Sequence, residues 1–166
     1  ELTLVGVHLK SRGGPPLLRS GITRLQTTSF DLRKEQAHAI RLFVDSVLRG
    51  DPAALVAVAG DFNDYRYPNV GEPIDHPLAI LEGMPEQPRL TDALDRVPEE
   101  SRYTFSHFDT KHPLDHILVS PALLERVAQV EIPHFNAGFP RSLSAHHETA
   151  QRSSDHDPVV MRVRTD

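Results

Sequence analysis

The sequence predicts a single α+β domain built on a mixed sheet with helices on one face. Its length of 166 residues suits one domain and is enough to bury a core. Apolar stretches with the alternation typical of strands are mixed with a long stretch of helical spacing. Helical patterns come early and strand patterns come in pairs late, which favours a layered sheet covered by helices.

The first strand and the first helix are the clearest elements of the pattern. Residues Leu2 to His8 alternate as a mostly buried strand, and a loop rich in Gly and Pro follows. From about Asp31 the apolar residues recur with helical spacing. The Gly-Asp-Pro sequence at 50–52 ends that helix.

A second buried strand and several shorter elements follow. The run ALVAVAG, residues 54–60, predicts a strand that delivers DFND at its carboxyl end. We expect residues 64–76 to form a loop. The remaining expectations are helical turns at 76–83 and 89–97, a hairpin pairing Tyr103–Phe108 with Leu114–Ser120, a helix starting at Pro121, a strand at Gln129–Ile132, a polar loop over 133–153 and a strand at Pro158–Arg164.

Composition excludes several classes of protein. The formal net charge of −5 lacks the basic footprint of a protein that holds nucleic acid by phosphate neutralisation alone, so a bound cation would have to supply positive charge to a phosphate ester. The absence of Cys excludes disulfides and a thiolate nucleophile but leaves the compartment open. The longest apolar stretch, Ala53–Ala59, is too short to span a bilayer.

Polar side chains that could bind a metal or take part in catalysis follow the two buried strands. In GDFN, Asp61 and Asn63 are two residues apart in extended backbone, so both side chains point to one side. A carboxylate and an amide placed in this way can hold a metal-bound water or a phosphate oxygen. Taken alone, GDFN favours a tight turn over a functional site, and His8 at its strand end can also be a satisfied histidine at a sheet edge.

Two further clusters border late strands. Asp115, in LDHILVS, can orient another histidine by accepting its Nδ1 proton, or can close a turn. In SSDHDPVV, Asp155 is a candidate metal carboxylate and His156 is the base that such an aspartate would orient. We interpret His116 as structural and Asp157 as a turn or capping group. The shared position of the candidates at strand ends predicts that they converge in one cleft.

Four clusters in this order, VHLKS, GDFN, LDHILVS and SDHDPV, resemble the endonuclease/exonuclease/phosphatase family, whose best-known members are DNase-type nucleases. The matches extend from residue 7 to residue 159, and HLKSRG and LDHILVSPALL look closest to bacterial secreted members. The resemblance implies a four-layer α/β/β/α sandwich, with two sheets face to face and helices outside. It also implies phosphodiester or phosphomonoester hydrolysis with Mg²⁺, for which Mn²⁺ or Ca²⁺ can substitute, and an extracellular or periplasmic location.

The resemblance also implies a role for each cluster. Asp155 helps to bind Mg²⁺, and His156, paired with Asp115, is the acid/base group near the scissile phosphate. Asp61 and Asn63 position the nucleophilic water, stabilise the transition state or contribute to the metal site, and His8 contacts the phosphate. Either Asp61 or His156 could take the proton of the water. Loop residues beside these groups are candidates for binding phosphate or stacking on bases, although the more ordinary interpretation is that they are solvated. They are Lys10, Arg12, Tyr65, Arg66 and Tyr67.

One departure from the family pattern concerns the metal site. The family also uses an early Asn and a metal-binding Glu from strands preceding VHL, and no glutamate here occupies a matching place. The chain therefore resembles the C-terminal portion of the fold, and we expect either the N-terminal half or a homodimer to cover its open apolar sheet face. The alternative hypothesis is a non-catalytic fragment or interaction module. A calcineurin-type phosphatase is less favoured, because companion D-x-H and G-N-H clusters are absent.

Overall fold

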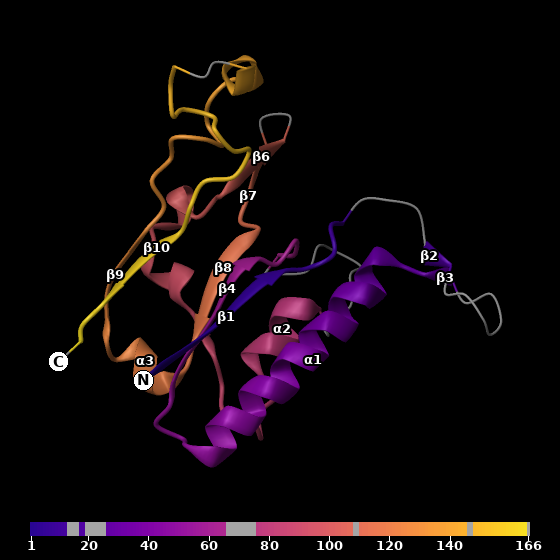
Figure 1. The fold of residues 1–166 in the computed structure, drawn as a ribbon, viewed down its shortest axis with the longest axis vertical. Helices are drawn as coiled ribbons and strands as arrows, with labels where there is room; N and C mark the ends of the chain where they lie inside the picture. Colours follow the sequence, from indigo (N-terminus) through magenta and orange to yellow (C-terminus); the bar gives the residue numbers. More distant parts are fainter. Residues whose placement is uncertain (13–16, 19–25, 66–75, 108–109, 146–147, 166) are drawn as a thin grey trace.

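A four-stranded mixed sheet forms the centre of the protein (Figure 1). The computed structural model describes residues 1–12, 17–18, 26–65, 76–107, 110–145 and 148–165. The strand order is β1-β4-β8-β5, with β1 parallel to β4 and the other neighbours antiparallel. The four strands are β1 (Leu2–His8), β4 (Leu55–Asp61), β8 (Asp115–Val119) and β5 (Thr91–Asp92).

Helix α1 (Ser29–Gly50) covers one face of this sheet together with α2 (Pro77–Glu82) (Figure 1). It begins at a capping box, in which Thr28 Oγ1 accepts the Asp31 N–H and the Asp31 carboxylate accepts the Thr28 N–H. Its apolar stripe packs against the inner side of β1 and β4. This placement confirms the predicted fold class of a mixed sheet with helices on one face.

The strand pair β9 (Val127–Glu131) and β10 (Val160–Val163) covers the opposite face of the central sheet (Figure 1). A second apolar core lies between this pair and the outward residues of β4 and β8. The β9–β10 pair does not fully cover this face of the sheet at β1. There Leu2 and Leu4 point away from α1, with 48% and 65% of their surface exposed.

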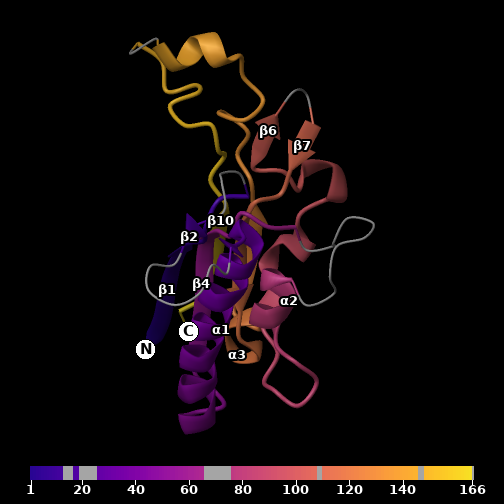
Figure 2. The ribbon, with the colours of Figure 1, turned by 90° about the vertical axis from the view of Figure 1, so that its right-hand side faces the viewer.

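Smaller elements complete the described structure. The β6–β7 hairpin and the polar segment 133–145 rise above the end of the sheet where β1 and β4 finish (Figures 1 and 2). None of the described helices is long and apolar enough to cross a membrane. The remaining elements are β2 (Leu17–Leu18), β3 (Gln26–Thr27), β6 (Phe105–His107), β7 (Thr110–His112), α3 (Pro121–Leu124), and the 3₁₀ turns η1 (Ala93–Arg96), η2 (Glu99–Ser101) and η3 (Arg141–Ala145).

Two local expectations are wrong. Of the predicted pair of strands 103–108 and 114–120, the described residues 103–107 do not pair with 114–120: β6 pairs with β7, and β8 pairs with β4 and β5. The apolar run of β8 is buried on both sides, so it is stabilised inside the sheet, and Pro113, which has no N–H, separates it from β7. The stretch 89–97 is not helical throughout, because Thr91 and Asp92 form β5 before η1 begins.

Candidate active site

Strand register brings three of the candidate residues together. His8 lies opposite Asp61 in the β1–β4 pair, and Asp61 lies opposite Asp115 in the β4–β8 pair. Because β8 runs against the other two strands, its first residue lies beside their last residues. The three side chains therefore occupy one end of the sheet, as their position at strand ends predicts.

Gly60 makes the close approach of β1 and β4 at this point possible. Its φ is +139°, and a Cβ at this position would lie 2.0 Å from the Val7 carbonyl oxygen. Only a residue without a side chain can occupy such a place. The glycine of GDFN is thus required by the backbone immediately before Asp61.

His156 and Asp115 form a hydrogen-bonded pair. The His156 Nδ1–H donates to Asp115 Oδ2 at 2.6 Å, and about a fifth of each side chain is exposed. The Asp115 hydrogen bond is the largest influence on the pKa of His156 and raises it, with the charges of Asp115, Asp61 and Asp155 adding to this against the effect of burial. Holding the proton on Nδ1 leaves Nε2 for proton transfer.

Asp61 is held by Asn63 on the turn that follows β4. The backbone N–H of Asn63 donates to Asp61 Oδ1 at 2.7 Å, and its side-chain amide donates to Asp61 Oδ2 at 3.0 Å and to the Leu9 carbonyl at 3.1 Å. His8 Nε2 lies 3.5 Å from Asp61 Oδ2. Burial raises the pKa of Asp61, as does the nearby charge of Asp115, although the Asn63 N–H opposes the shift.

A divalent cation fits the group formed by Asp61, Asp115 and His156. Each residue offers one ligand atom, and these atoms lie within 4.8 Å of one another. The two carboxylates suit Mg²⁺ or Mn²⁺, which prefer oxygen ligands, and a cation would relieve the repulsion between the two acids. Asp155, which the resemblance implies as a ligand, lies on an exposed position outside this group and acts on His156 through its charge.

The candidate substrate-binding residues are placed differently from one another. Arg12 donates to Asp64 at 3.1 Å and lies over the Tyr65 ring at 4.3 Å. The Tyr65 hydroxyl is 2.9 Å from His112 Nδ1, with the two rings stacked at 5.5 Å. Lys10 is bound at its backbone by the Gln36 side chain. Arg66 and Tyr67 lie outside the described residues.

Phe105 lies beside the hydrogen-bonded pair of Asp115 and His156, and the sequence did not predict this position. Its ring lies 4.9 Å from that of His156 and 6.2 Å from that of His112, so that a row of rings runs from this pair to Tyr65. The backbones of Phe105 and His156 also form an isolated β-bridge. The alternation of rings in YTFSHFDTKH was the available signal, but only the folded hairpin brings it to His156.

His116 and Asp157 have the structural roles expected of them. Buried His116 contacts Asp92 Oδ2 through Nδ1 at 2.7 Å and the Pro113 carbonyl through Nε2 at 3.1 Å. Burial is the largest influence on the pKa of His116 and lowers it. The hydrogen bond and the charge of Asp92, together with backbone hydrogen bonds, outweigh burial and leave the pKa raised. Asp157 is buried and accepts the N–H groups of Asn136 and Ala137.

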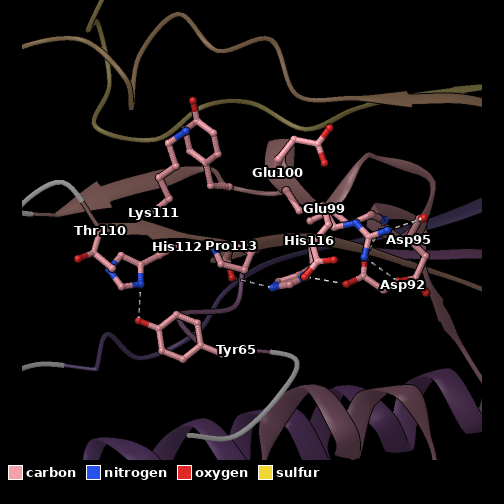
Figure 3. A pocket seen from close by; sticks show the side chains of 13 residues that line it. Tyr65, Asp92, Asp95, Glu99, Glu100, Thr110, Lys111, His112, Pro113 and His116 are labelled. Atoms are coloured by element: carbon pink, nitrogen blue, oxygen red, sulfur yellow. Dashed lines mark hydrogen bonds and ion pairs between the residues drawn. The ribbon is translucent and has the colours of Figure 1, made fainter.

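A cavity of about 550 Å³ lies beside the row of rings (Figure 3). Tyr65 and His112 lie on one side of its lining, and the hydrogen-bonded pair of His116 and Asp92 also lines it. Its size suits a small organic group. Its lining does not include Asp61, Asp115 or His156, so the cavity adjoins the candidate site without containing it.

Comparison with known proteins identifies the fold. No protein-family model and no curated protein matches the sequence. Among solved structures, a 3′ phosphatase from Neisseria, NExo, bound to a product DNA hairpin, superposes with a TM-score of 0.61 at 19% identity, covering 97% of this chain and 60% of that chain. A mannosyl-6-phosphatase from Bacteroides thetaiotaomicron superposes with a TM-score of 0.51 at 21% identity, covering 80% of this chain and 46% of that one. The chain thus spans 60% or less of the length of these structures, and it shares the fold of the parts that it covers.

Proposed function

We propose that this chain belongs to a hydrolase of phosphate esters that depends on a divalent cation. The supporting observation is the convergence of Asp61, Asp115 and His156, with their ligand atoms within 4.8 Å, at one end of the sheet. Such a cation would neutralise charge on the phosphate oxygens. The ion is proposed to be Mg²⁺, with Mn²⁺ or Ca²⁺ as possible substitutes.

Each residue of the group has a distinct part in the proposed chemistry. Asp115 holds the Nδ1 proton of His156, so that Nε2 can accept or donate a proton beside the phosphate. In this proposal Asp61, which is fixed by Asn63 and has a raised pKa, orients the attacking water. His8, with 77% of its side chain exposed, contacts the phosphate in the same proposal, and Asp155 adds negative charge near His156.

The proposed substrate is a nucleic acid. The ring row of Phe105, His112 and Tyr65 runs away from His156, and successive bases stack on rings of this kind without sequence preference. Arg12, above Tyr65, extends this surface with a cation. The DNA hairpin bound to the Neisseria phosphatase agrees with this choice, whereas the mannosyl-6-phosphatase represents the competing class of sugar phosphates.

Residues from outside this chain are proposed to complete the site. The described residues of the group offer two carboxylates, and Mg²⁺ needs about six ligands, part of which water and substrate supply. The exposed Leu2 and Leu4 on β1 offer an apolar surface that an additional segment could cover. A non-catalytic role for the isolated chain remains the competing hypothesis.

Metal removal tests the proposed function. The full-length protein is dialysed against EDTA and assayed on a DNA oligonucleotide with a 3′-phosphate, on an internal phosphodiester and on a sugar phosphate. We expect loss of hydrolysis after chelation and recovery on adding Mg²⁺, because the two acids otherwise repel the anionic substrate. Hydrolysis that survives complete chelation would contradict metal dependence. Preference for the sugar phosphate would contradict the nucleic-acid assignment.

A further inference from the structure

Thr104 is a fully buried residue that touches the backbone on both sides of the Asp115–His156 pair. It precedes β6, and none of its surface is exposed. Its hydroxyl oxygen accepts two consecutive backbone N–H groups at the start of β8, from Leu114 at 3.2 Å and from Asp115 at 3.1 Å. One side-chain oxygen therefore satisfies both donors where the strand bearing the aspartate begins.

The backbone of the same residue holds the histidine side of the pair. The Thr104 carbonyl accepts the Asp157 N–H at 2.7 Å, and Asp157 directly follows His156. The next residue, Phe105, forms the β-bridge with His156. The N–H of Thr104 itself donates to the His112 carbonyl at 3.0 Å, which fixes Thr104 to β7.

The contact also reaches the turn that carries Asp61. The Leu114 N–H donates to Thr104, while the Leu114 carbonyl accepts the Phe62 N–H at 2.9 Å. A shift of the Leu114 peptide would consequently move both the β8 entry and the GDFN turn. The buried hydroxyl of Thr104 therefore helps to fix the positions of both Asp115 and Asp61.

We propose that Thr104 is a positioning residue whose hydroxyl sets the distance between Asp115 and His156, an inference that rests on the proposed function. Removing the hydroxyl leaves two buried N–H groups without their acceptor, and the strand entry must move to find another. Proton transfer depends steeply on such geometry, since a displacement on the order of 1 Å can cost about 10²-fold in rate. A threonine that merely fills space in the core would not show this dependence on its oxygen.

The test compares Thr104→Val with Thr104→Ser in the full-length protein. Valine keeps the volume and removes the acceptor, whereas serine keeps the acceptor. We expect Thr104→Val to lower kcat by about 10-fold or more while KM changes by less than about twofold, and Thr104→Ser to retain most of kcat. Equal kcat in Thr104→Val and the parent protein, or equal losses in both variants, would overturn the proposal.

A double-mutant cycle separates positioning from general stability. If the hydroxyl acts through the pair, Thr104→Val should lower kcat much less in an Asp115→Asn background, where the pair is already impaired. Equal fold-losses in both backgrounds would show that Thr104 acts independently of the pair. If Thr104→Val fails to fold, Thr104→Cys, with a weak sulfur acceptor, should give an intermediate kcat at unchanged KM. A kcat for Thr104→Cys equal to that of the parent protein would overturn the proposal.

A spectroscopic readout keeps the inference separate from the enzymatic assignment. In Thr104→Val, hydrogen exchange at the Leu114 and Asp115 amides should accelerate, and the Nδ1 proton resonance of His156 should shift or broaden. Thr104→Ser should preserve both signals. Faster exchange with an unchanged His156 resonance would contradict the positioning role, whether or not the protein hydrolyses phosphate esters. Absence of hydrolysis by the parent protein would contradict the proposed function alone.

Discussion

Replacing His156 by alanine in the intact enzyme is expected to lower kcat by roughly 10²- to 10⁴-fold, the contribution of a positioned acid/base group. His156 donates Nδ1–H to Asp115 at 2.6 Å, which directs Nε2 to proton transfer, and alanine has no group that can replace it. Steady-state kinetics on a DNA substrate measure the loss. The matched control is His38→Ala on the exposed surface of α1, which should leave kcat unchanged. Near-normal turnover by His156→Ala would remove this residue from the mechanism.

Asp115→Asn extends this test to pH dependence. The carboxylate of Asp115 raises the pKa of His156 above its ordinary value of 6.5. The asparagine removes that charge, so the limb of the kcat profile that reports His156 should move to lower pH. In the parent protein, protonated His156 stabilises the folded state because its pKa is higher in the folded than in the unfolded chain. This stabilisation is complete at a pH below the unfolded-state pKa of His156, and it is lost as the pH rises through the folded-state pKa. Asp115→Asn should lose less stability over this pH range. If the His156 limb of its kcat profile does not move, the pairing of Asp115 with His156 is contradicted.

Gly60→Ala is expected to reduce the free energy of unfolding by about 3 kcal/mol or more. The added Cβ would lie 2.0 Å from the Val7 carbonyl oxygen, and the backbone φ of +139° is itself unfavourable for alanine. Since the obstructing atom belongs to the neighbouring strand, β1 and β4 must separate beside His8 and Asp61. Urea denaturation measures the change, and activity should fall with it.

Gly50→Ala supplies the matched control for this prediction. Gly50 is the last residue of α1, and a Cβ there would have nothing within 4 Å. We expect its free energy of unfolding to stay within about 1 kcal/mol of the parent value. If both alanine variants unfold at the same urea concentration, the close approach at Gly60 does not matter for stability.

The sequence by itself determined the elements whose signals are local. The alternation of β1, the helical spacing of α1 and the apolar run of β4 each depend on neighbouring residues, so their positions were predicted closely. Since strands of a sheet end at a common edge, the polar residues after β4 and before β8 were also expected to converge. The structure brings Asp61, Asp115 and His156 together in agreement with that expectation.

Only the tertiary structure decided which segments pair and which side chains meet across long stretches of sequence. The pattern of 103–120 suits a hairpin between its two apolar runs, but β8 gains more by burial between β4 and β5, and β6 is left to pair with β7. This pairing brings Phe105 to His156, and it lets Thr104 accept the backbone N–H groups of Asp115 and Asp157. Periodicity records which face of an element is buried, whereas the partner is selected by the free energy of burial in the assembled sheet, which no local pattern contains.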